Sequence, residues 1–385
     1  MTEYCLKIST YLFCIFAIID PANSILGLKI PTFILFLISL AIYAQPRFNN
    51  FMLVTSLIFI NVLSFVCGQV MHFSFDTSIT IQFLIFFFTL YALCWDYVID
   101  LFDALVISSV ILSIITIAGF IVVVCFPDVV ALLYGFSQDN NTVFMMSERN
   151  FLGITFYSFF YRSLPIVVIP ASIYFGRFLN EPYNKRFNLS LALLFLAALF
   201  CGGNRAMILG VFVIITISSY SKFKDNRFFK AILFLIIVAG LFVAYLAITE
   251  KGEESYDIKY GHLVSYVSYY SEKWYTMFLG AGAGSEFYSQ GFESMTGLTE
   301  WTYFEIIRMY GLVGLALMIY FLFKPVLFSP WPRNVRNWNQ VAFGYCLYMI
   351  LAGSNPNIFC STGLICILVV YSYIANPKYQ MSEEC

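Results

Sequence analysis

Long runs of hydrophobic residues, separated by short polar turns, make up most of this chain. A helix that crosses a bilayer needs about 20 predominantly apolar residues. On that measure the pattern predicts about 12 spanning helices, at residues 6–22, 28–44, 51–71, 78–95, 102–126, 163–179, 187–203, 205–221, 231–249, 303–323, 338–353 and 358–374. We therefore expect an all-α polytopic integral membrane protein, with residues 1–385 forming a single membrane domain.

The composition agrees with a bilayer environment. The chain is 61% hydrophobic and only 11% charged, whereas a soluble domain carries about 25% charged residues. A net charge of −1 gives no basic surface for nucleic acid, so we expect no nucleic-acid partner. The ten cysteines form no CxxC pair and mostly lie inside apolar runs, where they act as small hydrophobic residues rather than metal ligands or disulfide partners.

The distribution of basic residues predicts the orientation of the chain. Cytoplasmic loops of membrane proteins are enriched in Lys and Arg. With the N-terminus inside, 13 of the 21 basic residues fall on the cytoplasmic side: Lys7, Arg47, Arg177, Lys185, Arg186, Lys222, Lys224, Arg227, Lys230, Lys324, Arg333, Arg336 and Lys378. Both termini are then cytoplasmic. The first span has some features of a signal peptide, but the chain returns at once to the membrane, so we expect it to be retained.

Two long segments face outward in this layout, residues 127–162 and 250–302. They hold most of the basic residues that the cytoplasmic loops do not account for. A bundle that only transports tends to keep its loops short, so these segments are where we look for chemistry.

The turn CGGNRAMILG places Arg205 directly after Gly202 and Gly203, between two apolar runs. An arginine at a membrane edge often reaches into the lipid headgroups without further function. The tight turn, however, fixes the guanidinium near the outer surface. Its planar set of five donors suits a diphosphate.

The stretch SERNFLGITFYSFFYRSLP carries Arg149 and Arg162 around a cluster of aromatic residues. The aromatics favour an interfacial helix at headgroup depth. In the simpler interpretation, Glu148 and Arg149 form a local ion pair and Arg162 is an interface anchor.

The stretch GHLVSYVSYYSEKWYTMFLGAGAG contains His262, one of two histidines in the chain, with Lys259 three residues before it. Its spacing predicts a helix that runs along the surface and ends in a turn at glycines 280, 282 and 284. A nucleotide-binding interpretation of GAGAG is weak, because that motif needs a preceding strand and a GxGxxG spacing.

Charged residues follow this turn at the start of span 303–323. Glu305 and Arg308 are three residues apart, so they can pair on one helical face. Glu300 falls in the expected first helical turn, where a carboxylate is favoured by the helix dipole, and capping is its simplest interpretation.

Taken together, GGNRAMILG, FLGAGAGSEFY and TEWTYFEIIRMYGLVGLALM resemble the O-antigen polymerase and ligase superfamily of bacterial surface polysaccharide assembly. The motifs cover roughly residues 195–325. Arg205 stands where the family's ligases carry an arginine, and His262 with Lys259 stands near the place of their second basic residue. Glu300, eleven residues before Gly311, stands where the ligases carry a histidine, which favours a polymerase.

The resemblance implies a GT-C-like helical bundle with two large extracytoplasmic loops, in the bacterial inner membrane with its active site facing the periplasm. It implies a metal-independent glycosyltransferase that needs no cofactor. Donor and acceptor would both be oligosaccharides linked to undecaprenyl diphosphate, with a chain-length regulator and a flippase as candidate partners.

The resemblance also suggests a role for each candidate residue. Glu300 would act as the base or orient the acceptor, because a sugar hydroxyl is a poor nucleophile. Positive charge would stabilise the leaving diphosphate. This charge would come from Arg205 and Arg162, with Arg149, His262, Lys259 and Arg308 as further candidates.

Two other functions remain open at this stage. A ligase would move the finished glycan onto lipid A core, and a transporter or flippase would move the lipid-linked sugar itself. A transporter places ionisable residues deep within its spans. Few such residues lie in the predicted spans of this chain.

Overall fold

The computed structural model describes residues 2–46, 50–96, 101–140, 143–151, 154–223, 254–328, 337–352 and 358–375, with residues 238, 335 and 378. It is mostly helical, and every predicted span within these ranges coincides with a helix. The span predicted at 231–249 lies outside the described residues except for Val238. The longer helices are α1 (Thr2–Ile19), α2 (Lys29–Tyr43), α3 (Phe51–Val70), α4 (Thr77–Thr89), α5 (Leu101–Cys125), α6 (Pro127–Asp139), α7 (Val168–Asn180), α8 (Lys185–Cys201), α9 (Arg205–Phe223), α11 (Glu254–Glu272), α13 (Thr302–Phe323), α14 (Trp338–Ala352) and α15 (Ser361–Ala375).

Four helices of the described part are long and apolar enough to cross a membrane: Phe51–Val70, Thr77–Cys94, Leu101–Cys125 and Thr302–Leu327. Their outward faces carry exposed apolar side chains, such as Met52, Phe59 and Val66 on α3. Apolar surface of this extent needs a nonaqueous partner, so the protein is embedded in a membrane. The total number of spans and the outward placement of the long segments remain predictions.

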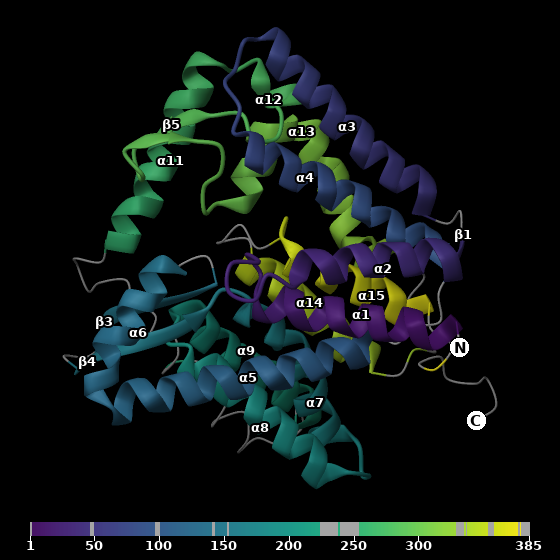
Figure 1. Ribbon diagram of the computed structural model, residues 1–385, viewed down its shortest axis with the longest axis vertical. Helices are drawn as coiled ribbons and strands as arrows, with labels where there is room; N and C mark the ends of the chain where they lie inside the picture. Colours follow the sequence, from purple (N-terminus) through teal and green to yellow (C-terminus); the bar gives the residue numbers. More distant parts are fainter. Residues whose placement is uncertain are drawn as a thin grey trace.

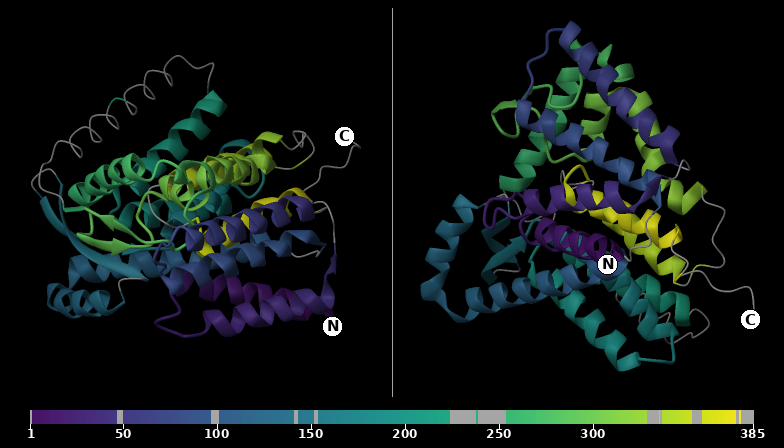
Figure 2. Two further views of the ribbon diagram at one scale, coloured as in Figure 1. Left: turned by 90° about the horizontal axis from the view of Figure 1, so that it is seen from above. Right: turned by 45° about the vertical axis from the view of Figure 1, so that its right-hand side comes forward.

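The helices form three groups (Figure 1). Helices α3, α4, α11 and α13 make the upper group, and α1, α2, α14 and α15 lie below them. Helices α5, α7, α8 and α9 make the lowest group, with α7 packed against both α8 and α14. Figure 2 shows the same helices from above and after a turn of 45° about the vertical axis.

At one end of the bundle, the beginnings and ends of several helices meet. The Ser163 hydroxyl, just before α7, donates to the carbonyl of Ile18 at the end of α1, at 2.5 Å. The Thr302 hydroxyl at the start of α13 donates to the carbonyl of Ala352 at the end of α14, at 3.2 Å. The described parts of segments 127–162 and 250–302 join helices at this end, which we call the loop end.

The opposite end of the bundle has its own contacts. Lys324, after α13, donates to the side chain of Asn50, before α3, at 3.2 Å. Lys378, after α15, pairs with Asp103 in the first turn of α5 at 3.1 Å. The consecutive helices α13, α14 and α15 therefore alternate in direction, as a chain that crosses repeatedly requires.

The aromatic stretch before α7 forms a β-hairpin, so the interfacial helix predicted there is wrong. Strand β3 (Phe144–Phe151) pairs antiparallel with β4 (Ile154–Tyr161), with Phe144 opposite Tyr161. Burial alternates along β3, since Phe144 and Met146 are buried while Met145 is exposed. That period of two, together with many β-branched and aromatic residues, is typical of a strand.

The second long segment contains the predicted surface helix, α11, and then the short helix α12 (Thr276–Leu279). A small hairpin of β5 (Phe287–Ser289) and β6 (Ser294–Thr296) follows the glycine turn. Residues 280, 282 and 284 all have positive φ, so the predicted glycine turn is confirmed. The glycine turn also packs against α13, α3 and α4, which the sequence did not predict.

Helix α13 is broken at Gly311, which has φ 68° and ψ −173°. In an unbroken helix, the carbonyls of Arg308 and Met309 accept hydrogen bonds from residues four positions later. Here they accept from the backbone N–H groups of Ala281 and Gly282, each at 2.9 Å. The glycine turn therefore supplies hydrogen bonds at the break, where unpaired backbone groups would be costly in a membrane.

The glycine turn is also held by α3 and α4. The Ser64 hydroxyl of α3 donates to the carbonyl of Leu279 at 2.6 Å. The Thr80 hydroxyl of α4 donates to the carbonyl of Ala283 at 3.0 Å. We call residues 279–284 the glycine plug, because they fill the space between α3, α4 and the break in α13.

Candidate active site

Glu300 lies in the loop between β6 and α13, at the loop end of the bundle. Helix α13 begins at Thr302 with Trp301 as its N-cap residue. Glu300 is therefore outside the first helical turn, which corrects the capping interpretation. One carboxylate oxygen lies 3.6 Å from the Lys259 ammonium nitrogen, and both side chains are about one-third exposed. Such an open ion pair contributes little to stability, and its partial exposure leaves both charges accessible to a ligand.

Arg162 brings the first long segment close to this pair. It follows β4, and its backbone N–H donates to the carbonyl of Val143 at 2.9 Å. Partial burial lowers the pKa of Arg162, while the negative charge of Glu300 raises it. An arginine remains protonated under such a shift. Glu300 therefore interacts with the charges of both Lys259 and Arg162, although Arg162 comes from a distant part of the chain.

His262 lies one turn after Lys259 on α11 but points into the protein. Its side chain is fully buried, and its Nδ1 atom is 2.7 Å from the Ser289 hydroxyl. Its Nε2 atom has no hydrogen-bond partner among the described residues. Burial lowers the pKa of His262 more than the nearby charges of Glu300 and Glu305 raise it. The imidazole is therefore neutral at pH 7, which does not support the predicted role of a cation.

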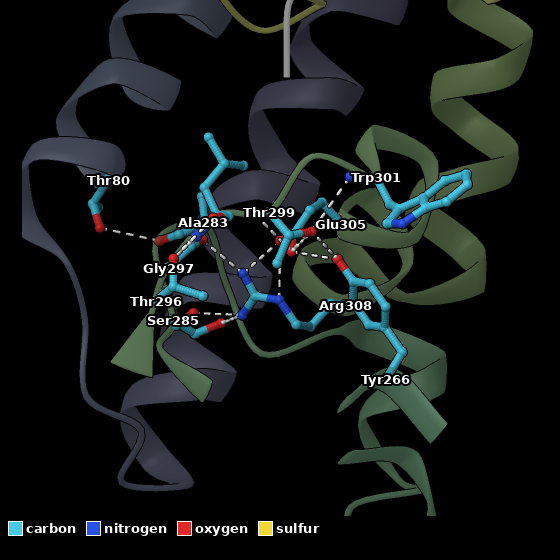
Figure 3. A network of polar contacts seen from close by, with 11 residues as sticks. Thr80, Tyr266, Ala283, Ser285, Thr296, Gly297, Thr299, Trp301, Glu305 and Arg308 are labelled. Carbon is cyan, nitrogen blue, oxygen red and sulfur yellow. Dashed lines mark hydrogen bonds and ion pairs between the residues drawn. The ribbon is translucent and has the colours of Figure 1, made fainter. Parts of the chain in front are cut away.

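Glu305 and Arg308 form the predicted pair, and both are fully buried (Figure 3). The Nε and Nη2 atoms of Arg308 donate to the Oε2 atom of Glu305 at 3.0 and 2.6 Å. Nη2 also donates to the carbonyl of Gly297 at 2.7 Å. Nη1 donates to the carbonyl and to the hydroxyl of Ser285. These contacts use all five donors of an arginine, so a diphosphate contact by Arg308 is not supported.

The other carboxylate oxygen of Glu305 holds two residues that the sequence analysis missed. The Tyr266 hydroxyl donates to Glu305 Oε1 at 2.5 Å. The backbone N–H and the hydroxyl of Thr299 donate to the same atom at 3.2 and 3.0 Å. Burial, and then the charge of Glu305, raise the pKa of Tyr266, so its phenol stays protonated. The sequence held only weak signals for these two residues. Tyr266 is four residues after His262, on the same helical face, and Thr299 directly precedes Glu300.

Two predicted site residues cannot be placed by their side chains. Arg205 begins α9 after the predicted turn, where Gly203 has φ 66°. Arg149 lies on β3 opposite Phe156. Both side chains lie outside the described residues, so their roles stay predictions.

The assembled site is a carboxylate with an ammonium and a guanidinium close by, at one end of an apolar helical bundle. It can bind an anion and accept a proton. Within the described ranges, no group of three or more His, Cys, Asp or Glu side chains is arranged to hold a metal ion. No protein family model, curated protein or solved structure matches the chain. The resemblance to O-antigen polymerases therefore rests on the motifs alone.

Proposed function

We propose that this protein is a polysaccharide repeat-unit polymerase. It transfers a growing glycan from undecaprenyl diphosphate onto a repeat unit that is itself linked to undecaprenyl diphosphate. The observation that carries the proposal is the position of Glu300, 3.6 Å from the Lys259 ammonium and within the electrostatic reach of Arg162. The protein would lie in the bacterial inner membrane, with this site facing the periplasm.

The proposed reaction uses these charges in one displacement. The acceptor hydroxyl attacks the anomeric carbon of the donor, and Glu300 takes the hydroxyl proton. The bond from that carbon to the diphosphate oxygen breaks, and undecaprenyl diphosphate leaves with the electron pair. Arg162 and Lys259 stabilise the charge on the leaving group, as fixed positive groups can. Arg205 is the third proposed diphosphate ligand, and Arg149 a supporting one.

In the proposed orientation, the site would lie where a lipid-linked diphosphate is held. Its lipid tail belongs in the apolar region and its sugars in water, so the diphosphate belongs at the boundary. Trp274 and Tyr288 are exposed in the same segment. Aromatic rings of this kind bind the apolar faces of sugars, and they are also common at membrane interfaces.

Two substitutions at Glu300 test the proposal in cells. Glu300→Gln keeps the size of the side chain and removes the base, and Glu300→Ala removes the side chain. A gel of the surface polysaccharide should lose its ladder of chain lengths in both variants. Glu272→Gln, at an exposed position at the end of α11, is the matched control and should keep the ladder. A normal ladder from well-expressed Glu300 variants would refute the proposal.

The same strains separate the polymerase from a ligase. Loss of a polymerase leaves the lipid core capped with a single repeat unit. Loss of a ligase leaves finished polymer on undecaprenyl diphosphate and the core without glycan. Accumulated lipid-linked polymer in the Glu300 variants would therefore favour the ligase.

The broken helix α13 is a feature that favours a transporter, because transporters place substrates at such breaks. In this chain, Ala281 and Gly282 already occupy the carbonyls of Arg308 and Met309. The donors of Arg308 are also taken within the protein. The break therefore offers few free groups to a substrate, and the polymerase is the better supported function.

A further inference from the structure

We infer that the buried pair of Glu305 and Arg308, together with Tyr266 and Thr299, positions Glu300 against Lys259. These are positioning residues, since their polar groups contact one another rather than the open carboxylate. The inference rests on the proposed function, in which Glu300 is the base. It adds four residues to which the sequence motifs give no role of this kind.

The loop that carries Glu300 is held on both sides of that residue. Arg308 binds the carbonyl of Gly297 at 2.7 Å, three residues before Glu300. Glu305 accepts hydrogen bonds from Thr299, directly before it, at 3.0 and 3.2 Å. The backbone N–H of Trp301, directly after it, donates to the Thr299 hydroxyl at 3.4 Å. Thr299 is buried, whereas the side chain of Glu300 is partly exposed.

The same carboxylate also holds the helix that carries Lys259. Tyr266 lies about two turns after Lys259 on α11, and its hydroxyl donates to Glu305 at 2.5 Å. The Trp301 indole N–H donates to the carbonyl of Lys259 at 3.2 Å. Glu305 is therefore a common attachment point for the base and for the cation beside it. Figure 3 shows Tyr266 and Thr299 converging on Glu305 from two different elements.

A purely stabilising role accounts less well for this arrangement. Two buried charges lose their hydration, and a well-packed apolar pair of similar volume is often as stable. The ion pair instead fixes the orientation of its neighbours, because each carboxylate oxygen and each N–H group bonds to a particular partner. Catalysis is sensitive to such placement, because an error of about 1 Å can reduce a rate by about 100-fold.

Thr299→Val is the most selective test. It removes the hydroxyl that contacts Glu305, the Trp301 N–H and the Tyr266 hydroxyl, the last at 2.6 Å, while the backbone N–H and the volume remain. Thr299→Ser restores a hydroxyl at the same place. Thr276→Val is the matched control, because Thr276 is equally buried in the same segment, and its hydroxyl donates to the carbonyl of Lys273 at 2.8 Å.

The first measurement is elongation of lipid-linked repeat units by the purified full-length protein. Thr299→Val should lower kcat about 10- to 100-fold while KM changes little, on the expected sensitivity of a rate to misplacement. Thr299→Ser should recover most of the rate, and Thr276→Val should keep it. Tyr266→Phe is a second variant, expected to lower kcat in the same direction.

The second measurement does not depend on activity. A carbodiimide joins a carboxylate directly to a neighbouring amine, so it should link Glu300 to Lys259, and mass spectrometry of the peptides measures the yield. Thr299→Val should lower that yield severalfold, and Thr299→Ser should restore it. Unchanged linking and an unchanged kcat in Thr299→Val would overturn the inference.

The two proposals fail in different ways. If the purified parent protein does not elongate lipid-linked repeat units, the proposed function is wrong, while the linking experiment still decides the positioning. If Glu300→Gln is inactive but Thr299→Val matches the parent protein in both measurements, the positioning inference is wrong and the polymerase stands. Equal loss in Thr299→Val and Thr299→Ser would also overturn the inference, because the hydroxyl would then be irrelevant.

Discussion

Replacing Gly280 by alanine tests whether the glycine plug completes helix α13. Gly280 has φ 75° and ψ −179°, a backbone region that is essentially open only to glycine. An added Cβ would stand 2.2 Å from the carbonyl oxygen of Met309, which is backbone and cannot rotate away. Gly311 is packed equally closely against the segment before Gly280. A Cβ added at Gly311 would be 2.1 Å from the carbonyl oxygen of Phe278.

The cost follows from two independent terms. The unfavourable backbone conformation contributes about 1–3 kcal/mol. Forcing a methyl group into a packed site contributes about 1–3 kcal/mol more. If the plug moves to relieve the clash, the hydrogen bonds of Ala281 and Gly282 weaken, at about 0.5–1.5 kcal/mol each. We expect Gly280→Ala to lose about 2–6 kcal/mol in total.

Thermal unfolding of the purified protein in detergent measures the effect, with two glycines as controls. Gly27 has φ 68° with no described atom within 4 Å of an added Cβ, so alanine there should cost only about 1–2 kcal/mol. Gly135 lies in helix α6, also in open space, so alanine should be neutral or stabilise by up to about 1 kcal/mol. If Gly280→Ala is no less stable than Gly27→Ala, the plug does not carry the contact we assign to it.

Two further predictions concern buried charge. Arg308→Met leaves the carboxylate of Glu305 buried without its partner. It should lower the free energy of unfolding by about 3–5 kcal/mol in the same assay. A loss below about 1 kcal/mol, which is the range of an exposed ion pair, would contradict the assigned burial. Burial lowers the pKa of His262 in the folded protein, so the unfolded chain takes up the proton first and stability should fall as the pH drops below about 6.5. His262→Gln should lack that part of the pH dependence, and an identical profile for the variant would show that His262 does not contribute to it.

The helices were predictable because length and hydrophobicity are local properties. Each apolar run of sufficient length became a helix wherever the structure describes it, with ends within a few residues of the prediction. The hairpin of β3 and β4 was missed because the aromatic residues in ITFYSFFY were assigned to an interfacial helix. Aromatic and β-branched residues are also enriched in strands, and ITFYSFFY has no regular apolar and polar alternation that would have favoured a strand.

The sequence predicted individual residues of the candidate site, but not which of them meet in space. Glu300, Lys259 and Arg162 stood out as charges beside apolar runs, but their meeting depends on how α11 and the β-hairpin pack at the loop end. The spacing of Glu305 and Arg308 predicted their pairing. It did not predict that all the donors of Arg308 would be used within the protein, because Ser285 and Gly297 are brought there by the tertiary fold.

The break in α13 could not be recognised from the sequence. Gly311 sits in an apolar run that is otherwise uniformly helical in character, and glycine is frequent in membrane helices. Its conformation is decided by the glycine plug, which is contributed by residues about 30 positions earlier in the chain.

The order of synthesis means that the glycine plug is made before the helix that it completes. Chains emerge N-terminus first. Ser64 and Thr80, which donate hydrogen bonds to the glycine plug, therefore leave the ribosome before it. The plug in turn precedes Gly311. When α13 leaves the translocon, the N–H groups that complete its backbone are already synthesised nearby, and its two freed carbonyls can pair without meeting hydrocarbon. A circular permutant that places α13 ahead of the plug would reverse this order and release an incomplete helix into the bilayer.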